Sequence, residues 1–537
     1  MLSTISLFGR DIQVHISPVS ALVLLGGVWI IRRVLSVLRV WLAPSIFPRE
    51  YTAFQPLQLP GVLLPTTSWT TGLDWQWVRR AKLYNRGETV ALTPILAGSP
   101  NLWTSNMDIG RQVIPGSHKS SFWKPQWASQ ALLIWGMNLI GADGNTWRRH
   151  RRVVGPSFSS ELYKLVWTKT VQTYHDMVQS EGWATKDTTT VPVIQDITMK
   201  MAFLIITSCG FGFESTWADP PRSKGDQMPA QEALRIVTDA HMLLVSCPDW
   251  ILRLPIAKLR TARMARDRLI SFMREQIAER KAQVAMGNAG GMRSDAFTML
   301  VKANQDESSK YQLDDEELIG NIFVLLLAGH ETTSHTLAAT LGFMAIHEEV
   351  QDEVVEQIMS VVGHDRDPEF EDYSKLDKVL AIFYEAARML PAGYVLIREA
   401  TDDTILTVPN PVGEEGSQNI PIAKGTQIIV DMVGVQWNPR YFEHPHVYNP
   451  SRWYGLPADS EKFTAFSVGP RACIGRKFAT VEATCFLALL LRDWKVLPVL
   501  RDGENKEEWG ARMLQANIGL TLGVHNIPLR FERRKRA

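Results

Sequence analysis

Apolar positions in this 537-residue chain recur mainly at the three- and four-residue spacing of helices. The longest interior apolar segment, residues 318–346, follows an acidic run from Asp314 to Glu317, which is typical of a helix N-terminus. Further helical spacing occurs at residues 349–362, 375–390 and 479–491. Strand-like runs occur at residues 89–96, 404–408 and 427–430. The pattern predicts a mainly α fold with a small β region.

The N-terminal region has a different pattern. Residues 12–31 are nearly uncharged, and their length just spans a hydrocarbon core of ~30 Å. Arginines follow this run more often than they precede it, which places the rest of the chain in the cytosol. Residues 34–42 continue as an apolar stretch suited to the membrane interface. A cleaved signal peptide is the alternative, but the run is long, and it lacks both a basic start and an Ala-x-Ala site. We therefore expect a single-pass anchor within residues 1–50 and a catalytic domain over residues 51–537.

Composition narrows the function classes. The chain has 45% hydrophobic and 21% charged residues and a net charge of +1, which argues against nucleic-acid binding, because such domains are usually strongly basic. Four cysteines in a chain of this length do not form a disulfide framework and fit a reducing compartment.

One cysteine lies in a glycine-rich turn immediately before the predicted helix 479–491. Residues 466–475 read Phe-Ser-Val-Gly-Pro-Arg-Ala-Cys-Ile-Gly. Gly469 and Gly475 allow a tight turn in which amide N–H groups point at the sulfur of Cys473. These dipoles favour the thiolate, the form that ligates a metal, and Arg471 supplies a positive charge for a nearby anionic group. Cys473 taken alone would more often be an ordinary buried thiol. The neighbouring positions, Phe466 included, favour Cys473 as a metal ligand over an ordinary buried thiol.

This loop resembles the haem-binding loop of the cytochrome P450 superfamily, Phe-x-x-Gly-x-Arg-x-Cys-x-Gly, at every specified position. The resemblance is to microsomal-type, membrane-anchored members of a fungal-like kind. It implies haem b, an iron protoporphyrin with Cys473 as the axial thiolate, and this ligation favours O–O cleavage. It also implies the cytochrome P450 fold, triangular and mainly α, for the haem-thiolate catalytic domain.

The segment Ala-Gly-His-Glu-Thr-Thr at residues 328–333 resembles the oxygen-binding groove of the family. Oxygen activation needs room beside the iron, a hydroxyl for hydrogen bonding and an acid that passes protons. Ala328 and Gly329 would provide the room, Thr332 the hydroxyl and Glu331 the acid. Alternatively, Glu331 is solvated or paired and Thr332 bonds its own helix, as mid-helix threonines do. We expect that alternative for Thr333 but not for Thr332.

Two further motifs match the family. Glu385 and Arg388 have the i, i+3 spacing of a helical salt bridge, which is usually solvated. In the family this pair is buried and joined by an arginine from a downstream loop, here Arg452, and its role is structural.

Trp147 and Arg151 are four residues apart and would share a helix face. The resemblance implies that both contact a haem propionate, as does Arg398. Neighbouring basic residues would form a patch on the thiolate side that docks an electron donor; these are Arg148, Arg149, Arg152 and Lys477.

The motifs together predict a monooxygenase that inserts one oxygen atom from O2 into a lipophilic small molecule. The expected substrates are terpenoids, steroids or aromatic compounds, from secondary metabolism or as xenobiotics. Electrons would come from an NADPH-cytochrome P450 reductase, with cytochrome b5 as an optional second donor, at the endoplasmic reticulum membrane. The alternative is a haem-thiolate isomerase or dehydratase that acts on peroxides without a reductase. The Glu331–Thr332 pair favours the monooxygenase over this alternative and over a haem sensor.

The predicted substrate lining is almost entirely apolar, which is the reason for expecting a lipophilic substrate. The lining residues expected from the matched motifs are Val324, Leu327 and Ala328, with Ala392, Gly393, Tyr394 and Leu396 opposite, and with weaker support Trp123, Trp127 and Met513.

Overall fold

The computed structural model divides the chain into two compact units, Met1–Thr104 and Ser105–Ala537. The residues that it describes are 2–7, 10–15, 18–42, 45–115, 120–213, 216–218, 228–286, 295–305, 311–457 and 460–535.

The first unit contains strands and an apolar helix. Strands β3, β4 and β5 are neighbours in that order; β3 pairs parallel with β4, and β4 pairs antiparallel with β5. The elements of this unit are β1 (Leu2–Leu7), β2 (Arg10–His15), α1 (Pro18–Leu42), β3 (Arg49–Phe54), α2 (Trp75–Leu83), β4 (Thr89–Ala97) and β5 (Asn101–Thr104).

Helix α1 is long and apolar enough to cross a membrane, and its described side chains are not buried in the protein. The predicted span at residues 12–31 starts too early, because residues 12–15 belong to β2 and the helix begins at Pro18. The apolar stretch 34–42 continues the same helix, since α1 runs without a break to Leu42. The guanidinium of Arg33 donates hydrogen bonds to backbone carbonyls of Ile95 and Gly98, at 2.9 and 2.7 Å. These bonds hold α1 against the end of β4.

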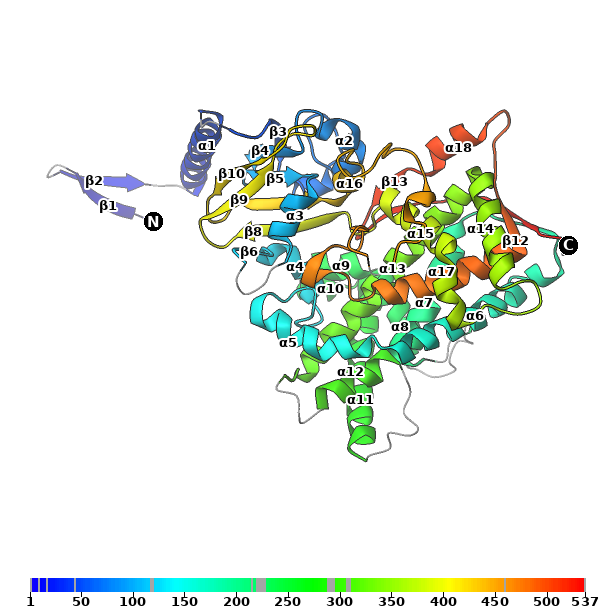
Figure 1. Ribbon diagram of the computed structural model, residues 1–537. Helices are drawn as coiled ribbons and strands as arrows, with labels where there is room; N and C mark the ends of the chain where they lie inside the picture. Colours follow the sequence, from blue (N-terminus) through cyan, green and yellow to red (C-terminus); the bar gives the residue numbers. More distant parts are fainter. Residues whose placement is uncertain are drawn as a thin grey trace. The chain divides into compact units, whose positions relative to one another are not determined.

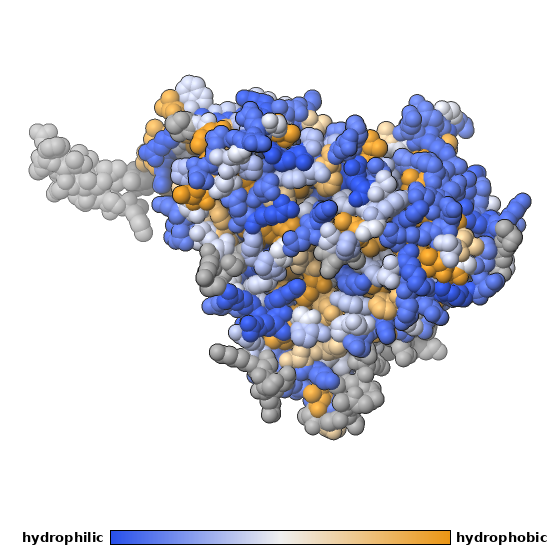
Figure 2. Space-filling model, viewed as in Figure 1, coloured by the Kyte–Doolittle hydropathy of each residue, from blue (hydrophilic) through white to orange (hydrophobic). Residues whose placement is uncertain are grey.

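Helices dominate the second unit (Figure 1). They are α3 (Met107–Val113), α4 (Gln126–Leu133), α5 (Gly144–Val154), α6 (Ser160–Ser180), α7 (Ile194–Phe211), α8 (Ala230–Asp239), α9 (His241–Ser246), α10 (Asp249–Leu252), α11 (Ala257–Ala285), α12 (Ala296–Gln305), α13 (Asp315–Ile346), α14 (Glu348–Val361), α15 (Asp377–Met389), α16 (Met432–Gln436), α17 (Arg476–Asp493) and α18 (Lys506–Met513). The surface in view is mostly hydrophilic, with apolar residues in small groups (Figure 2).

The strands of this unit form small antiparallel sheets, with the orders β11-β8-β6, β10-β9, β12-β15-β7 and β13-β14. Their bounds are β6 (Phe122–Trp123), β7 (Thr188–Val191), β8 (Val395–Ala400), β9 (Thr404–Pro409), β10 (Ser417–Ile422), β11 (Gln427–Asp431), β12 (Trp494–Pro498), β13 (Ala516–Ile518), β14 (Leu522–Val524) and β15 (Leu529–Arg533). The strands predicted at 404–408 and 427–430 are confirmed as β9 and β11, and the one predicted at 89–96 is β4 of the first unit.

Helix α13 is the central element of the second unit, and α7 and α15 pack beside it (Figure 1). Its start is fixed by a reciprocal cap: the Asp314 side chain accepts from the Glu317 N–H, and the Glu317 side chain accepts from the Asp314 N–H. Most residues of α13 are buried, so the helix has no solvent-facing side that would require polar residues. Its apolar run is therefore continuous. Helix α7 is also apolar, but 72% of it is buried within the protein, which is typical of a core helix rather than a membrane span.

A buried ion cluster joins α15 to the segment after α16. Glu385 and Arg388 are fully buried, and two hydrogen bonds of 2.9 and 2.8 Å join them. Arg452 donates to the same carboxylate at 3.2 Å, as the family resemblance implied. Trp453 Nε1 and the backbone N–H of Asn449 donate as well, at 2.7 and 2.9 Å. These donors compensate the carboxylate for its loss of water.

We predict that Arg388→Met lowers the free energy of unfolding by about 3–5 kcal/mol, because it leaves the Glu385 carboxylate buried without its main counter-charge. Chemical denaturation monitored by circular dichroism measures this loss. Arg530→Met removes a half-exposed pair with Glu532 and should cost less than about 1 kcal/mol. Equal losses in the two variants would contradict a special role for the buried cluster.

Candidate functional site

The cysteine loop adopts the tight turn that its sequence indicates. Ser467 and Gly469 both have φ of 65°, and the Cys473 N–H donates to the Phe466 carbonyl at 2.9 Å. Helix α17 then starts at Arg476. A Cβ atom on Gly475 would lie 3.9 Å from the Cys473 sulfur, so this glycine backs closely on the sulfur. The loop therefore presents one sulfur atom at a helix N-terminus.

Opposing effects act on the Cys473 thiol. The side chain of Cys473 is open to the cavity, but the surrounding protein shields it from bulk water. This desolvation has the largest influence and raises the pKa of Cys473 above its ordinary value. The N–H groups of Gly475 and Arg476 donate to the sulfur, and the charges of Arg151 and Arg476 lie near it; these lower the pKa of Cys473 in part. The amide N–H groups and the arginine charges favour the thiolate but do not outweigh burial, so the pKa of Cys473 stays above its ordinary value. A bound metal ion would shift this balance towards the thiolate.

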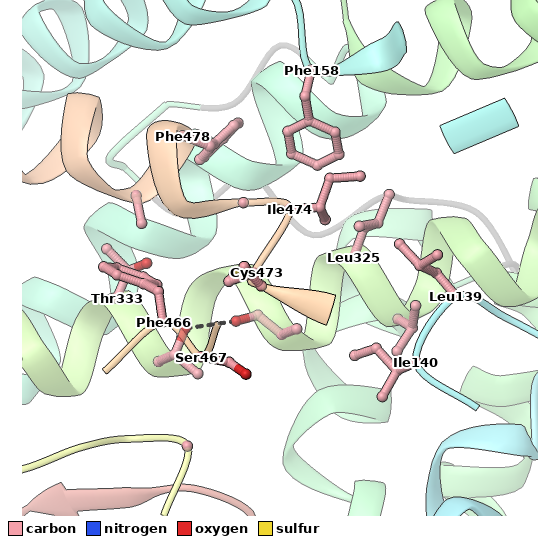
Figure 3. A pocket seen from close by; sticks show the side chains of 18 of the residues that line it. Leu139, Ile140, Phe158, Leu325, Thr333, Phe466, Ser467, Cys473, Ile474 and Phe478 are labelled. Carbon is pink, nitrogen blue, oxygen red and sulfur yellow. Dashed lines mark hydrogen bonds between the residues drawn. The ribbon is translucent and has the colours of Figure 1, made fainter. Parts of the chain in front are cut away.

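A cavity of about 430 Å³ lies between this loop and α13. Cys473 is in the middle of its lining, with Phe466 and Ser467 on one side and Leu325 on the other (Figure 3). Further apolar lining comes from α7, α12, α13 and the segment after α15, including Ile206, Leu300, Val324, Ala328, Ala392 and Leu396.

Basic residues line the same cavity; they are Lys124, Arg151, Arg398 and Arg471. Arg471 pairs with Asp143 at 2.6 Å, and its guanidinium lies 4.4 Å from the centre of the Trp147 ring. Lys124 pairs with the same carboxylate at 3.1 Å.

The positive charges of these four residues are only partly balanced by the one carboxylate of Asp143. Burial and then the nearby Arg471 charge lower the pKa of Lys124 to about 7. Burial lowers the pKa of Arg398 and of Arg471 to about 10. The Nε atoms of both arginines are buried and lack a hydrogen-bond partner within the described part of the chain. This cluster fits an anionic ligand that brings further acceptors, as the carboxylates of a haem would.

On α13, Thr332 lines the cavity, but its hydroxyl donates to the Ala328 carbonyl at 2.7 Å. The expectation that Thr332 would not bond its own helix is therefore wrong. The hydroxyl satisfies its proton locally and keeps its oxygen lone pairs for a ligand. Gly329 also lines the cavity, and a Cβ there would approach Ile206 to 3.0 Å, so this glycine lets α7 pack closely.

Glu331 lies beside the cavity rather than in its lining. Its carboxylate accepts a hydrogen bond of 2.8 Å from the Thr521 hydroxyl in the turn between β13 and β14. Burial raises the pKa of Glu331 above its ordinary value, and the Thr521 bond opposes this shift. The carboxyl therefore keeps its proton to a higher pH than an ordinary glutamate does, as a group that passes protons requires.

Most predicted site residues meet at this cavity. Its lining includes Phe466, Arg471, Cys473, Gly475, Trp147, Arg151, Arg398, Ala328 and Thr332. Gly469 shapes the turn without lining the cavity. Of the predicted substrate contacts, Val324, Ala328, Ala392, Gly393 and Leu396 line it, whereas Leu327, Tyr394, Trp123, Trp127 and Met513 do not.

Sequence reasoning missed Lys124, Asp143 and Thr521. Asp143 precedes α5 and could have been recognised as a helix cap, but nothing local indicates its pairing with Arg471. One residue of the predicted docking patch has partners within the protein. Arg149 pairs with Glu317 and donates to the Gln312 carbonyl at 3.2 Å, so part of its charge is compensated.

The sequence and fold of this chain are similar to those of known proteins. The family described as Cytochrome P450 matches residues 101–522. The chain is 34% identical over 426 residues to cytochrome P450 monooxygenase 124 of Postia placenta, covering 78% of this chain and 80% of that protein. It is 27% identical to human cytochrome P450 4F11, over 95% of each chain. The crystal structure of the cytochrome P450DA heme domain shares the fold, with a TM-score of 0.67 at 19% identity, covering 91% of this chain and 98% of that one. The chain therefore belongs to the cytochrome P450 family of haem-thiolate monooxygenases and is an oxidoreductase.

Proposed function

We propose that this protein binds haem b through Cys473 and inserts one oxygen atom from O2 into a lipophilic small molecule, with electrons from an NADPH-dependent reductase. The observation that carries the proposal is the cavity itself. It joins a thiol at a helix N-terminus, a group of under-compensated cations and an apolar wall in one space. Bound haem would supply O2 activation, and thiolate ligation favours O–O cleavage.

The basic residues orient the cofactor in this proposal. Arg398 and Arg471 offer buried, unpaired Nε–H donors, and Lys124 and Arg151 add positive charge. Two carboxylates of a porphyrin would neutralise this group and would raise the lowered pKa of Lys124.

Residues on and near α13 would transfer protons and bind the substrate. Thr332 offers its hydroxyl oxygen as an acceptor in the cavity, and Glu331 behind it carries a proton, since burial raises the pKa of this carboxyl above its ordinary value. The wall formed by Val324, Ala392 and Leu396 excludes water and favours an apolar substrate such as a terpenoid, steroid or aromatic compound.

Helix α1 supports the proposed electron supply and location. An apolar helix near the N-terminus supports attachment to a membrane, which we propose is that of the endoplasmic reticulum with residues 51–537 in the cytosol. A diflavin NADPH-cytochrome P450 reductase on the same membrane, with or without cytochrome b5, would then reach the thiolate side. Arg152, which is exposed on α5, is the cation that we propose guides this partner.

The proposal is tested by turnover with isotopically labelled O2. Purified protein, a diflavin reductase and NADPH are incubated with a library of terpenoids, steroids and aromatic compounds that first give a substrate-binding difference spectrum. Products should carry one labelled oxygen and should need the reductase. Reductase-independent rearrangement of lipid peroxides, with no labelled oxygen gained, would instead support the isomerase or dehydratase alternative.

We predict that Cys473→Ser abolishes the absorption band of the reduced carbonyl complex from which the family takes its name, because a hydroxyl does not replace the thiolate donor. Absorption spectra of the reduced, CO-saturated proteins measure it. Cys209→Ser and Cys485→Ser change buried thiols away from the cavity lining and should keep the band. A normal band in Cys473→Ser would remove Cys473 as the ligand.

We predict that Thr332→Ala lowers the product formed per NADPH roughly tenfold, the effect of losing one hydrogen bond of about 1.4 kcal/mol. NADPH oxidation should continue, with more hydrogen peroxide released. Thr340→Ala is the matched control, because Thr340 is also bonded to its own helix, at 2.7 Å from the Thr336 carbonyl, but lies outside the cavity lining. Equal coupling in both variants would reduce Thr332 to a helix residue.

We predict that Arg152→Glu slows reduction of the haem by the reductase at low salt, because an exposed cation there steers an acidic partner. Stopped-flow absorbance at two ionic strengths measures the rate, and the difference from wild type should disappear near 1 M salt, where the Debye length is ~3 Å. Lys186→Glu reverses an exposed charge on another segment and should leave the rate unchanged. A salt-independent defect in Arg152→Glu would argue against docking at α5.

A further inference from the structure

Two histidines lie behind Glu331, on the side away from the cavity lining. His335 is one turn after Glu331 on α13, and its Nε2 atom is 3.9 Å from Glu331 Oε1. His525, in the segment after β14, has its ring 5.6 Å from the ring of His335. His335 is buried, whereas His525 is exposed to solvent. The two rings therefore lie in a row between the surface and the carboxyl of Glu331.

The position of His335 is built into the fold. Its ring lies against the backbone of Gly523 in β14, and a Cβ atom on Gly523 would overlap the ring. The β13–β14 turn that supplies this glycine also supplies Thr521, whose hydroxyl fixes Glu331 at 2.8 Å. One hairpin thus aligns both groups.

One ring nitrogen of His335, Nδ1, is buried and packs against Gly523 without a hydrogen-bond partner among the described residues. Buried polar atoms are normally paired with protein or with ordered water. The gap of 3.9 Å between Nε2 and Glu331 Oε1 is also longer than a hydrogen bond, and a small rotation of either side chain would close it.

We propose that His525 and His335 form a proton relay that carries protons from solvent to Glu331. The proposal rests on the proposed role of Glu331. Monooxygenation consumes one O2, two electrons and two protons per substrate and releases one water, so protons must be replaced in every cycle. A proton enters at His525, passes to one nitrogen of His335 while the other nitrogen releases its proton to Glu331, and Glu331 delivers it beside Thr332.

The charge state of His335 suits this role. Burial, followed by the neighbouring His525 and His330, lowers the pKa of His335 to about 4, so the ring is neutral at physiological pH. A neutral imidazole has one N–H and one lone pair, and it can accept a proton on one nitrogen while donating from the other. The other titratable groups near this pair are His330 on α13, which bonds the Leu326 carbonyl, and Tyr394, whose pKa burial and Glu331 raise.

The test compares coupling in His335→Gln, Glu331→Gln and the double variant, using the full-length holoenzyme. Groups in series fail together, so each single variant should lower product per NADPH about tenfold or more, and the double variant should lose no more than the worse single one. His347→Gln is the control outside this cluster, because His347 pairs with Glu349 at the start of the next helix; it should keep wild-type coupling.

Carbonyl spectra and melting midpoints first confirm that each variant is folded and loaded. Wild-type coupling in a folded His335→Gln, while Glu331→Gln is impaired, would overturn the relay alone. Wild-type coupling in Glu331→Gln would overturn the proposed role of Glu331. Losses that multiply in the double variant would show independent actions and would also overturn the relay.

A second measurement does not depend on turnover. NMR of protein labelled at the histidine rings should show that Glu331→Gln shifts the His335 resonances, and that His525→Gln shifts them too, while those of His347 stay in place. Unmoved His335 resonances in both variants would contradict the relay even if His335→Gln proved too unstable to assay.

Discussion

The hydrogen bonds to the buried carboxylate of Glu385 are the interaction on which the position of the cysteine loop depends. It receives hydrogen bonds from Arg388 on its own helix and from Arg452, Trp453 and Asn449 further along the chain. A buried carboxylate with this many donors is stable only while all of them stay in place. The cluster therefore fixes α15 and the segment 449–453 as one body.

This body positions the cysteine loop through aromatic packing. Tyr384, next to Glu385, stacks on Phe463 with ring centres 4.0 Å apart. Phe463 contacts Phe466, whose carbonyl accepts from the Cys473 N–H at 2.9 Å. The guanidinium of Arg476, the first residue of α17, lies 5.7 Å from the Phe463 ring centre. The position of the Cys473 sulfur therefore depends, through these aromatic contacts, on an ion cluster that lies outside the cavity lining.

Features that depend on neighbouring residues could be predicted from the sequence, and features that depend on distant pairings could not. The turn around Cys473, the cap at Asp314 and the Glu385–Arg388 spacing are local, so their residues carry the geometry. The pairings of Arg471 with Asp143 and of Arg149 with Glu317 join distant segments, and no local pattern marks them. The hydroxyl of Thr332 bonds its own helix because a neighbouring carbonyl is always within reach, which the family pattern does not reveal. The start of α1 was misplaced because an apolar run does not distinguish strand from helix at its end.

The central claim is that Cys473 binds the iron of a haem in the cavity facing α13. X-ray absorption at the iron edge of the purified, substrate-free protein tests it most directly, because it reports the atoms bound to iron. The account predicts one sulfur atom at bonding distance in addition to the porphyrin nitrogens, with that sulfur absent from Cys473→Ser. An iron coordinated only by nitrogen and oxygen in the wild-type protein would contradict the account.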